Sequence, residues 1–333
     1  MSRKKSVYLF ILIFVLVAFA SAEGQKEQTY DISFGHNFMP DSVHHKAIMK
    51  FKEEVARRSD NELIVSVFHS GQLGSPREQF EGLQVGSLEI TMVPTARISG
   101  FVPQMQIFDL PFLFPSLEIR NSIMDGPIGR ELLNTMNDQN VKGIGFYDDG
   151  FKQITSNKIL RTPNDFKGLK FRTMESDIIM EQYKALGANP VPIDYSEVYN
   201  ALQMGIVDGQ ENPIILIHDM KFYEVQDYLM LTNHAFLGGV LLYSTNWFEG
   251  LPKNLQDILV DEGEKLVQFV RQGVQEMEKA RLKEIQDSGT VIVELTENER
   301  DALKRETLAV HDIYKNKYGA DIVNKIYEAV DSY

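Results

Sequence analysis

Short apolar runs alternate along the first half of this chain with longer segments whose apolar residues recur about every four positions. The short runs have the length of buried strands and lie at 30–35, 63–68 and 88–93. A helix is predicted to start at Ser75, because Pro76 suits the first helical position and Glu78 completes a capping box. The first half therefore predicts alternating strands and helices, which is the pattern of an α/β layer fold.

The second half continues the alternation. Strands are predicted at 141–147, 151–155, 169–173, 190–193, 228–232, 236–245 and 290–295. Helices are predicted at 175–186, at 196–203 and in one closing segment that begins at Thr296. The residues at 148–150, Asp-Asp-Gly, are interpreted as a turn between two strands and as a crossing between two domains. The prolines within 110–115 make that apolar stretch a packed loop.

One helical pattern, from residue 252 to about residue 287, is much longer than the others. Its apolar residues fall on one face, as in a helix that packs on a core. At 1.5 Å per residue it would span about 50 Å, which is too long for one small domain. We therefore predict a helix that bridges two domains and helps to set the hinge between them.

The amino terminus has the three parts of a secretory signal peptide. Three basic residues precede an apolar run of about fourteen residues, and an Ala-Ser-Ala sequence ends at Ala22. The run is shorter than the roughly 18 residues of a membrane-spanning helix, so cleavage near Ala22 is predicted. The chain has no cysteine, which excludes lipid attachment, disulfides and thiolate metal ligands. Export without a lipid anchor predicts a periplasmic location.

The remaining chain is strongly acidic. Loss of residues 1–22 removes three basic residues and no acidic ones, which leaves 31 Lys and Arg against 47 Asp and Glu, a net charge of −16. Nucleic acids and anionic lipids need a basic surface, so neither is a predicted partner. The overall field also opposes an approaching anion. If the ligand is an acid, its affinity must come from local donors.

Motifs of catalysis are lacking. The chain has no GxSxG elbow, no GxxxxGK phosphate loop and no complete dinucleotide turn. Adjacent helical residues diverge by about 100°, so His44 and His45 are interpreted as a solvated helix face rather than as metal ligands. The histidines at 69, 218 and 234 stand apart from one another in the sequence. The sequence thus predicts a binding protein with no metal or cofactor; a secreted hydrolase is the alternative.

Arg172 and Asn212 are the strongest candidates for binding residues. Arg172 lies at the end of a predicted strand, where open α/β sheets bind ligands, and its planar fork matches a carboxylate. A surface salt bridge is the alternative for this residue. Asn212 precedes Pro213, which holds it out of helical geometry and can project its amide from a strand-to-helix junction; a simple turn is the alternative. These two positions predict a grip on a small acid.

Two further residues are weaker candidates. Tyr195 could stack on a ligand and offer its hydroxyl, although many such tyrosines serve only in packing. Lys152 follows the predicted domain crossing and could supply a second cation, with an exposed lysine as the alternative.

These segments together resemble the periplasmic solute receptors of the tripartite ATP-independent (TRAP) transporters, the DctP family. The resemblance covers essentially the whole chain after the signal peptide, and its most specific segments are GLKFRT at 168–173 and ALQMGIVDGQENP at 201–213. It implies two α/β domains with mixed sheets, hinge strands and a long bridging helix. The domains close over an organic anion, which is passed to a membrane permease.

The resemblance also implies roles for individual residues. Arg172 matches the arginine that clamps the ligand carboxylate, Asn212 and Tyr195 match pocket positions, and Asn37 matches another. Lys152 matches a position that is often arginine. Receptors for sialic acid carry acidic groups where this chain has prolines 76 and 94, so that ligand is disfavoured.

We therefore predict a monomeric periplasmic receptor whose domains comprise residues 23–149 plus 238–277 and residues 150–237 plus 278–333. Arg172 from one domain and Asn37 or Arg97 from the other would be satisfied together only in the closed state. The predicted ligand is a uronate or another sugar acid, delivered to a TRAP permease. A four-carbon dicarboxylate, or service to an ATP-driven importer, is the alternative.

Overall fold

The computed structural model describes residues 28–333, so the predicted signal peptide and its cleavage site lie outside the described residues. The strands are β1 (Tyr30–His36), β2 (Leu63–Phe68), β3 (Ile90–Pro94), β4 (Val141–Ser156), β5 (Lys170–Thr173), β6 (Asn189–Pro192), β7 (Gly209–Pro213), β8 (Tyr228–Leu231), β9 (Phe236–Ser244) and β10 (Val291–Glu294).

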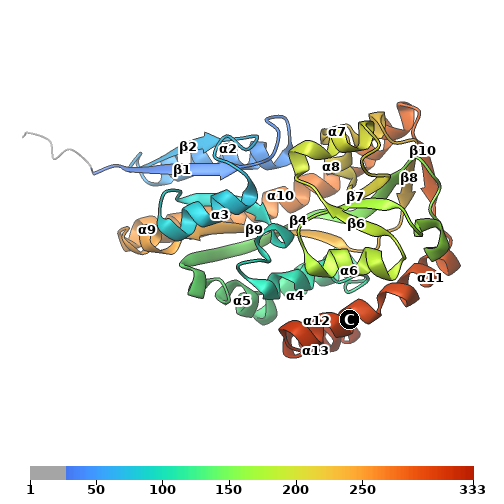
Figure 1. The fold of residues 1–333 in the computed structure, drawn as a ribbon. Helices are drawn as coiled ribbons and strands as arrows, with labels where there is room; N and C mark the ends of the chain where they lie inside the picture. The colour runs from blue at the N-terminus through green and yellow to red at the C-terminus, as the bar shows by residue number, and fades with distance from the viewer. Residues whose placement is uncertain (1–27) are drawn as a thin grey trace, which may run out of the picture.

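Helices surround these strands (Figure 1). The α-helices are α2 (Val43–Arg58), α3 (Pro76–Val85), α4 (Leu117–Met124), α5 (Pro127–Asn134), α6 (Asp177–Ala185), α7 (Val198–Gln203), α8 (Ile214–Asp219), α9 (Thr245–Glu249), α10 (Lys253–Asp287), α11 (Glu297–Thr307), α12 (Ala309–Tyr318) and α13 (Asp321–Asp331). The 3₁₀ helices are η1 (Thr95–Ile98), η2 (Pro103–Asp109), η3 (Asn137–Gln139), η4 (Pro163–Phe166), η5 (Tyr195–Glu197) and η6 (Phe222–Glu224).

The strands follow the order β2-β1-β3-β9-β4-β7-β5-β6, and β8 joins β10 to the end of β4. Strands β1, β2 and β3 are parallel, as are β5, β6 and β7, whereas β9 and β4 run antiparallel to their neighbours. Strands β1, β2, β3 and β9 belong to a first lobe, and strands β5, β6, β7, β8 and β10 belong to a second lobe (Figure 1). Strand β4 is shared, which confirms a mixed-sheet α/β fold.

Strand β4 is the main connection between the lobes. It is continuous over 16 residues, so the predicted turn at 148–150 is wrong. Its pairing with β9 shifts register between Asp148 and Phe151, and Gly150 there has a φ of +95°. Beyond the shift, β4 pairs with β7 and β8. A bulge of this kind bends a strand without ending it, so one strand can serve both lobes.

Helix α10 confirms the predicted long helix. It packs against α2 of the first lobe, α8 of the second and β4 between them. Its Arg271 is buried, donates from Nε to the carbonyl oxygen of Phe146 at 3.0 Å, and pairs through Nη1 with Asp125 at 2.8 Å. The guanidinium therefore ties the middle of the helix to β4 and to the end of α4.

The carboxyl-terminal segment differs from the sequence-based prediction, which placed a single helix there. Three helices follow residue 296, and the last of them, α13, packs on α4 and α5. Val323 and Ile326 of α13 enter the apolar core that contains Leu132 of α5. Although the predicted domain boundaries stay a prediction, this packing joins α13 to the first lobe.

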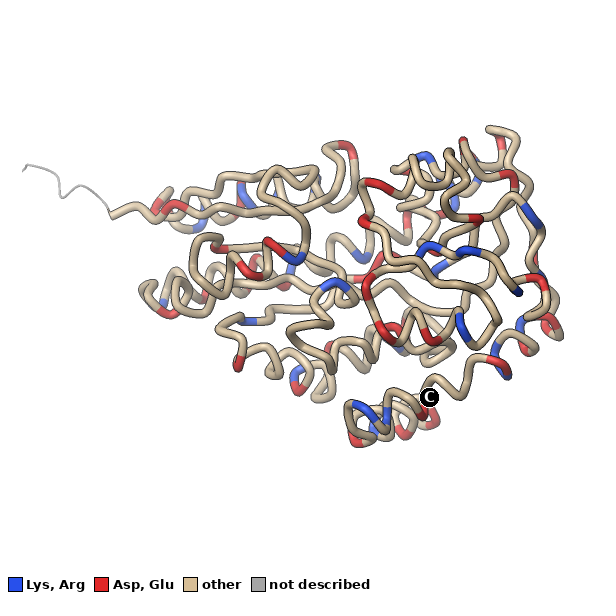
Figure 2. Tube along the Cα trace, in the orientation of Figure 1, with Lys and Arg blue, Asp and Glu red and all other residues tan. Residues whose placement is uncertain are grey.

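Charged residues are spread over both lobes. Figure 2 shows Lys and Arg intermixed with Asp and Glu along the chain. No helix within residues 28–333 is long and apolar enough to cross a membrane.

The close contact between β4 and β9 predicts that replacing Gly239 with a residue that has a Cβ destabilises the fold. This residue pairs with Tyr147, and a Cβ placed on it would lie 2.0 Å from Cζ of the buried tyrosine ring. We expect Gly239→Ala to lower the free energy of unfolding by about 2 kcal/mol or more, measured by urea denaturation, because overpacking a core costs about 1–3 kcal/mol. Gly100→Ala is the control, since its Cβ would approach nothing closer than 4.0 Å. Equal stability of the two variants would contradict this account.

Candidate functional site

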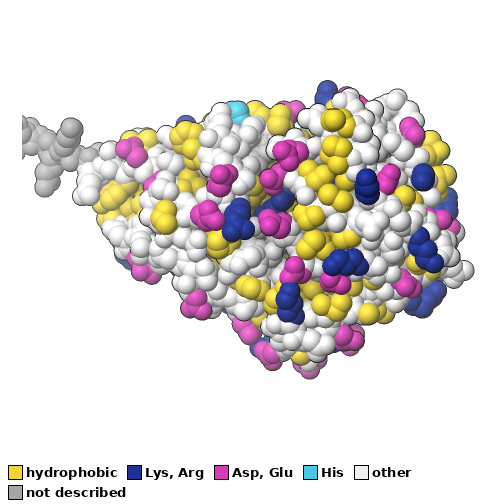
Figure 3. Space-filling model, in the orientation of Figure 1, with side chains coloured by type: hydrophobic (Ala, Val, Ile, Leu, Met, Phe, Trp, Pro, Cys, Tyr) yellow, Lys and Arg dark blue, Asp and Glu magenta, His cyan; other side chains and the backbone are white. Residues whose placement is uncertain are grey.

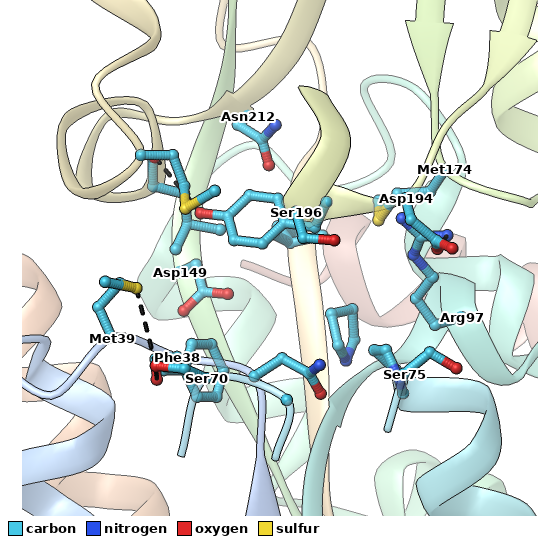
Figure 4. A pocket seen from close by; sticks show the side chains of 18 of the residues that line it. Phe38, Met39, Ser70, Ser75, Arg97, Asp149, Met174, Asp194, Ser196 and Asn212 are labelled. Carbon is cyan, nitrogen blue, oxygen red and sulfur yellow. Dashed lines mark hydrogen bonds and ion pairs between the residues drawn. The ribbon is translucent and has the colours of Figure 1, made fainter. Parts of the chain in front are cut away.

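A cavity of about 320 Å³ lies between the two lobes (Figure 4). Five of the six predicted site residues line it, namely Asn37, Arg97, Arg172, Tyr195 and Asn212. Asn37 and Arg97 come from the first lobe, and the other three come from the second. Figure 3 shows basic and acidic side chains side by side near the junction of the lobes.

Arg172 occupies the carboxyl end of β5, between parallel strands β6 and β7. The residue is only 1% exposed, and its Nε and Nη2 both donate to the carbonyl oxygen of Ile193, at 3.0 and 2.9 Å. Within residues 28–333, no carboxylate lies within ion-pair distance of this guanidinium. Burial, and after it the nearby charge of Arg97, lower the pKa of Arg172 to about 9. The site therefore holds a buried cation whose counter-ion is missing from the described protein.

Arg97 reaches the same place from the first lobe. It lies on η1, donates from Nη1 to Oδ1 of Asp194 at 2.9 Å and from Nη2 to the carbonyl oxygen of Ile193 at 3.2 Å. Asp194 is more than half exposed, whereas the Arg97 side chain is nearly buried. Burial lowers the pKa of Arg97, while Asp194 opposes that shift. Two guanidinium groups thus converge on the carbonyl oxygen of Ile193, and of the two only Arg97 pairs with a carboxylate among the described residues.

Asn212 and Tyr195 border the cavity from the second lobe. Asn212 is the last residue but one of the buried β7, which ends at Pro213 directly before α8, as the predicted strand-to-helix junction requires. Its amide donates to Oε1 of Gln210. Tyr195 opens η5 and donates its hydroxyl to the carbonyl oxygen of Leu216 at 3.4 Å, a long contact. Both side chains keep polar atoms that can turn to a ligand.

Asn37 is held rigidly on the opposite side. Its Nδ2 donates to the carbonyl oxygen of Gly74 at 3.2 Å, and its Oδ1 accepts from Nε2 of Gln79 at 2.9 Å. The prolines at 76 and 94 also line the cavity, where their side chains offer no hydrogen-bond donor or acceptor. The other polar side chains on this side of the cavity include Ser70, Ser75 and Arg97.

Lys152 does not line the cavity. It is 1% exposed, and its Nζ donates to Oε1 of Glu211 at 2.8 Å. The other oxygen of Glu211 accepts from the hydroxyl of Tyr183 at 2.7 Å and bonds Nε2 of His234 at 2.7 Å. Burial opposes ionisation of Glu211, but Lys152 and His234 hold its pKa well below the usual range. The lysine is neither exposed nor free, because it neutralises a buried carboxylate between β4 and β7.

The histidine interpretation was wrong for His44, which is fully buried and bonds Asp149. His45 does diverge from it, since its Nδ1 lies 3.1 Å from Nε2 of His36. His234 is isolated in the sequence but bonds Glu211 in the fold. Separation along the chain was a poor guide here, because the partners come from other strands and helices.

Comparison with known proteins decides the family. The model of the DctP family, "Bacterial extracellular solute-binding protein, family 7", matches residues 34–317. The chain belongs to this family. The DctP family consists of solute-binding receptors, so neither the hydrolase nor the ATP-driven importer alternative is retained.

Three relatives represent the range of DctP-family ligands. The C4-dicarboxylate-binding periplasmic protein DctP of Rhodobacter capsulatus is 31% identical over 300 residues, 90% of each chain. The sugar acid binding protein DctPAm of Advenella mimigardefordensis, solved with galactonate, has a TM-score of 0.88 and 32% identity, and the match covers 92% of this chain and 99% of that one. A TRAP receptor of Sulfurospirillum deleyianum, solved with succinate, has a TM-score of 0.86 and 31% identity, with coverage of 90% and 99%.

Two acidic residues of the cavity escaped the sequence analysis. Asp149 and Asp194 both line it, and Figure 4 shows them on different sides. Asp149 was interpreted as part of a turn, and Asp194 carried no pattern that set it apart. Their positions depend on the bulge in β4 and on the pairing with Arg97, which local periodicity does not report.

The buried ion pair of this DctP-family receptor predicts a stability defect. We expect Lys152→Met to lower the free energy of unfolding by about 3 kcal/mol, because it leaves Glu211 buried without its cation. Lys170→Met is the matched control, since Lys170 is exposed and such surface changes stay within about 0.5 kcal/mol. Urea denaturation monitored by circular dichroism measures both. A Lys152→Met protein as stable as the control would show that the pair adds nothing.

Proposed function

We propose that this protein binds a small organic acid in the cavity between its lobes, and that Arg172 grips the carboxylate. The observation that carries the proposal is the burial of the Arg172 guanidinium without any carboxylate partner in residues 28–333. A buried cation is costly unless it is paired. A ligand carboxylate in the cavity supplies the missing charge and can bind the planar fork.

The other lining residues have supporting roles in this proposal. Asn212 and Tyr195 hold the ligand from the second lobe, and Asn37 and Arg97 hold it from the first. Because no single lobe carries all of these groups, the ligand stabilises the closed arrangement over an open one. Lys152 acts at a distance by holding Glu211, and it is not proposed as a ligand contact.

A sugar acid, either a uronate or an aldonate, is the proposed ligand class. Relatives solved with galactonate, β-D-galacturonate and D-glucuronate support it. A four-carbon dicarboxylate is the second candidate, because Arg97 provides another cation and relatives are described as C4-dicarboxylate-binding proteins. The prolines at 76 and 94 offer no polar contact to the larger polar arm of sialic acid.

We further propose that the protein is exported to the periplasm, cleaved near Ala22, and delivers its ligand as a monomer to the membrane permease of a TRAP transporter. The basic and apolar pattern of the amino terminus supports export. Relatives described as periplasmic TRAP receptors support the location and the partner.

Removal of the Arg172 guanidinium tests the clamp. We expect Arg172→Ala to weaken binding of every acid at least about a hundredfold by calorimetry, because a buried ion pair with the ligand is lost. The melting temperature of the unliganded protein should change by no more than about 3 °C, since the variant also relieves an unpaired buried charge.

Arg77→Ala serves as the control, because Arg77 pairs with Glu81 on the exposed face of α3. It should bind with the affinity of the wild type. Retention of affinity in Arg172→Ala would remove the clamp from the proposal.

A further inference from the structure

A second buried charge borders the cavity, and it is negative. Asp149 lies in the bulge of β4, is 2% exposed and lines the cavity. Figure 4 shows its carboxylate among the lining side chains, between Phe38 on one side and Asn212 on the other, and apart from Arg97. The cavity therefore has positively charged and negatively charged side chains at different places on its wall.

Within residues 28–333, one oxygen of this carboxylate has a hydrogen-bond partner and the other has none. Oδ1 of Asp149 bonds Nε2 of His44. Oδ2 is buried and has no hydrogen-bond partner within residues 28–333. Because a buried acceptor without a donor costs free energy, a hydrogen bond donated to Oδ2 would be favourable. The residue borders the cavity, so a bound molecule can supply that donor.

The ring of His44 is held in place beside the carboxylate of Asp149. His44 is stacked on Phe38 with ring centroids 3.8 Å apart and planes 8° apart, so its ring is fixed. Its Nδ1 is buried and has no partner in the described part of the chain. Nε2 is therefore the ring atom that donates to the carboxylate of Asp149.

No arginine or lysine within residues 28–333 forms an ion pair with Asp149. The buried Arg120 donates from Nη1 to Oδ2 of the preceding residue, Asp148, at 3.1 Å, and Nε of Arg271 lies 3.9 Å from the same oxygen. Among the described residues, the side-chain hydrogen-bond partner of Asp149 is His44. The negative charge at this place in the cavity is therefore not cancelled by an arginine or lysine.

We propose that Asp149 determines ligand selectivity by accepting a hydrogen bond from a ligand hydroxyl and by repelling a second carboxylate. This inference rests on the proposed function, in which Arg172 holds the first carboxylate. The class of ligand is then a polyhydroxy acid with one carboxylate, an aldonate or a uronate. An unfavourable contact between Asp149 and a second carboxylate is one way for the site to discriminate against a diacid.

Charge repulsion and hydrogen bonding at Asp149 both favour an acid with one carboxylate over an acid with two. Two like charges held in a buried site repel far more strongly than they would in water. A hydroxyl, in contrast, donates to Oδ2 and satisfies it. A ligand that differs only by oxidation of its terminal CH₂OH to a carboxylate exchanges the favourable contact for the unfavourable one.

Matched acids test this on the wild-type protein. D-galactonate and galactarate share one carbon skeleton and differ only at that terminal group. We expect calorimetry to give an affinity for galactonate at least about tenfold higher than for galactarate. D-gluconate and D-glucarate form a second pair that differs in the same way, with the same expectation. Equal affinity within both pairs would overturn the inference.

Asp149→Asn tests the residue itself. Asparagine keeps the shape and an oxygen that accepts from His44, but it removes the charge and offers an NH₂ donor to a carboxylate. The ratio of galactonate to galactarate affinity should fall at least about tenfold. Asp138→Asn is the charge-matched control, because Asp138 is exposed on η3 and changes the net charge equally. It should leave the ratio unchanged.

The outcomes separate this inference from the proposed function. An unchanged ratio in a folded Asp149→Asn protein overturns the role of Asp149 and leaves the carboxylate clamp intact. A wild-type protein that binds succinate but neither galactonate nor glucuronate also overturns the role of Asp149 and leaves the carboxylate clamp intact. Failure of the wild type to bind any of these acids removes the proposed function as well. If Asp149→Asn does not fold, the two matched pairs on the wild type decide the question.

Discussion

The burial of a guanidinium that has no carboxylate partner within residues 28–333 is the constraint on which this site depends. Arg172 is placed at the end of a short strand between two parallel neighbours, and the carbonyl oxygen of Ile193 holds one edge of its fork. A fold tolerates such a cation only when something supplies the opposite charge. Arg97 lies beside it on the other lobe and adds a second positive charge, which makes an anion between the lobes more favourable still.

Next to this site, the protein neutralises charge inside its own core. The residues of β7 are all buried although three of its five side chains are polar, because Lys152 and His234 satisfy Glu211 and Gln210 bonds Thr155. Such a network specifies the pairing of β4 with β7, since a slipped register would leave buried charges unpaired. Strand β4 also carries Asp149, three residues before Lys152, so the strand that joins the lobes also shapes the cavity.

Much of the fold was predictable because its signals are local. The strand runs, the capping box of α3 and the single apolar face of α10 each lie within one segment, and the structure confirms them. The errors have physical causes as well. Strand β7 lacks an apolar pattern because its burial is compensated by distant partners, and the turn expected at 148–150 is a bulge because β9 and β7 continue the pairing on either side.

The sequence by itself determined the α/β alternation, the bridging helix, and Arg172 and Asn212 as candidates, because residue type and short-range spacing carry that information. The tertiary structure decided which charges are paired. It turned Lys152 inward to Glu211 and buried His44 against Asp149. Within residues 28–333 it left Arg172 without a carboxylate partner and one oxygen of Asp149 without a donor. Those pairings join residues that are tens to more than a hundred positions apart, and no local period encodes a contact of that range.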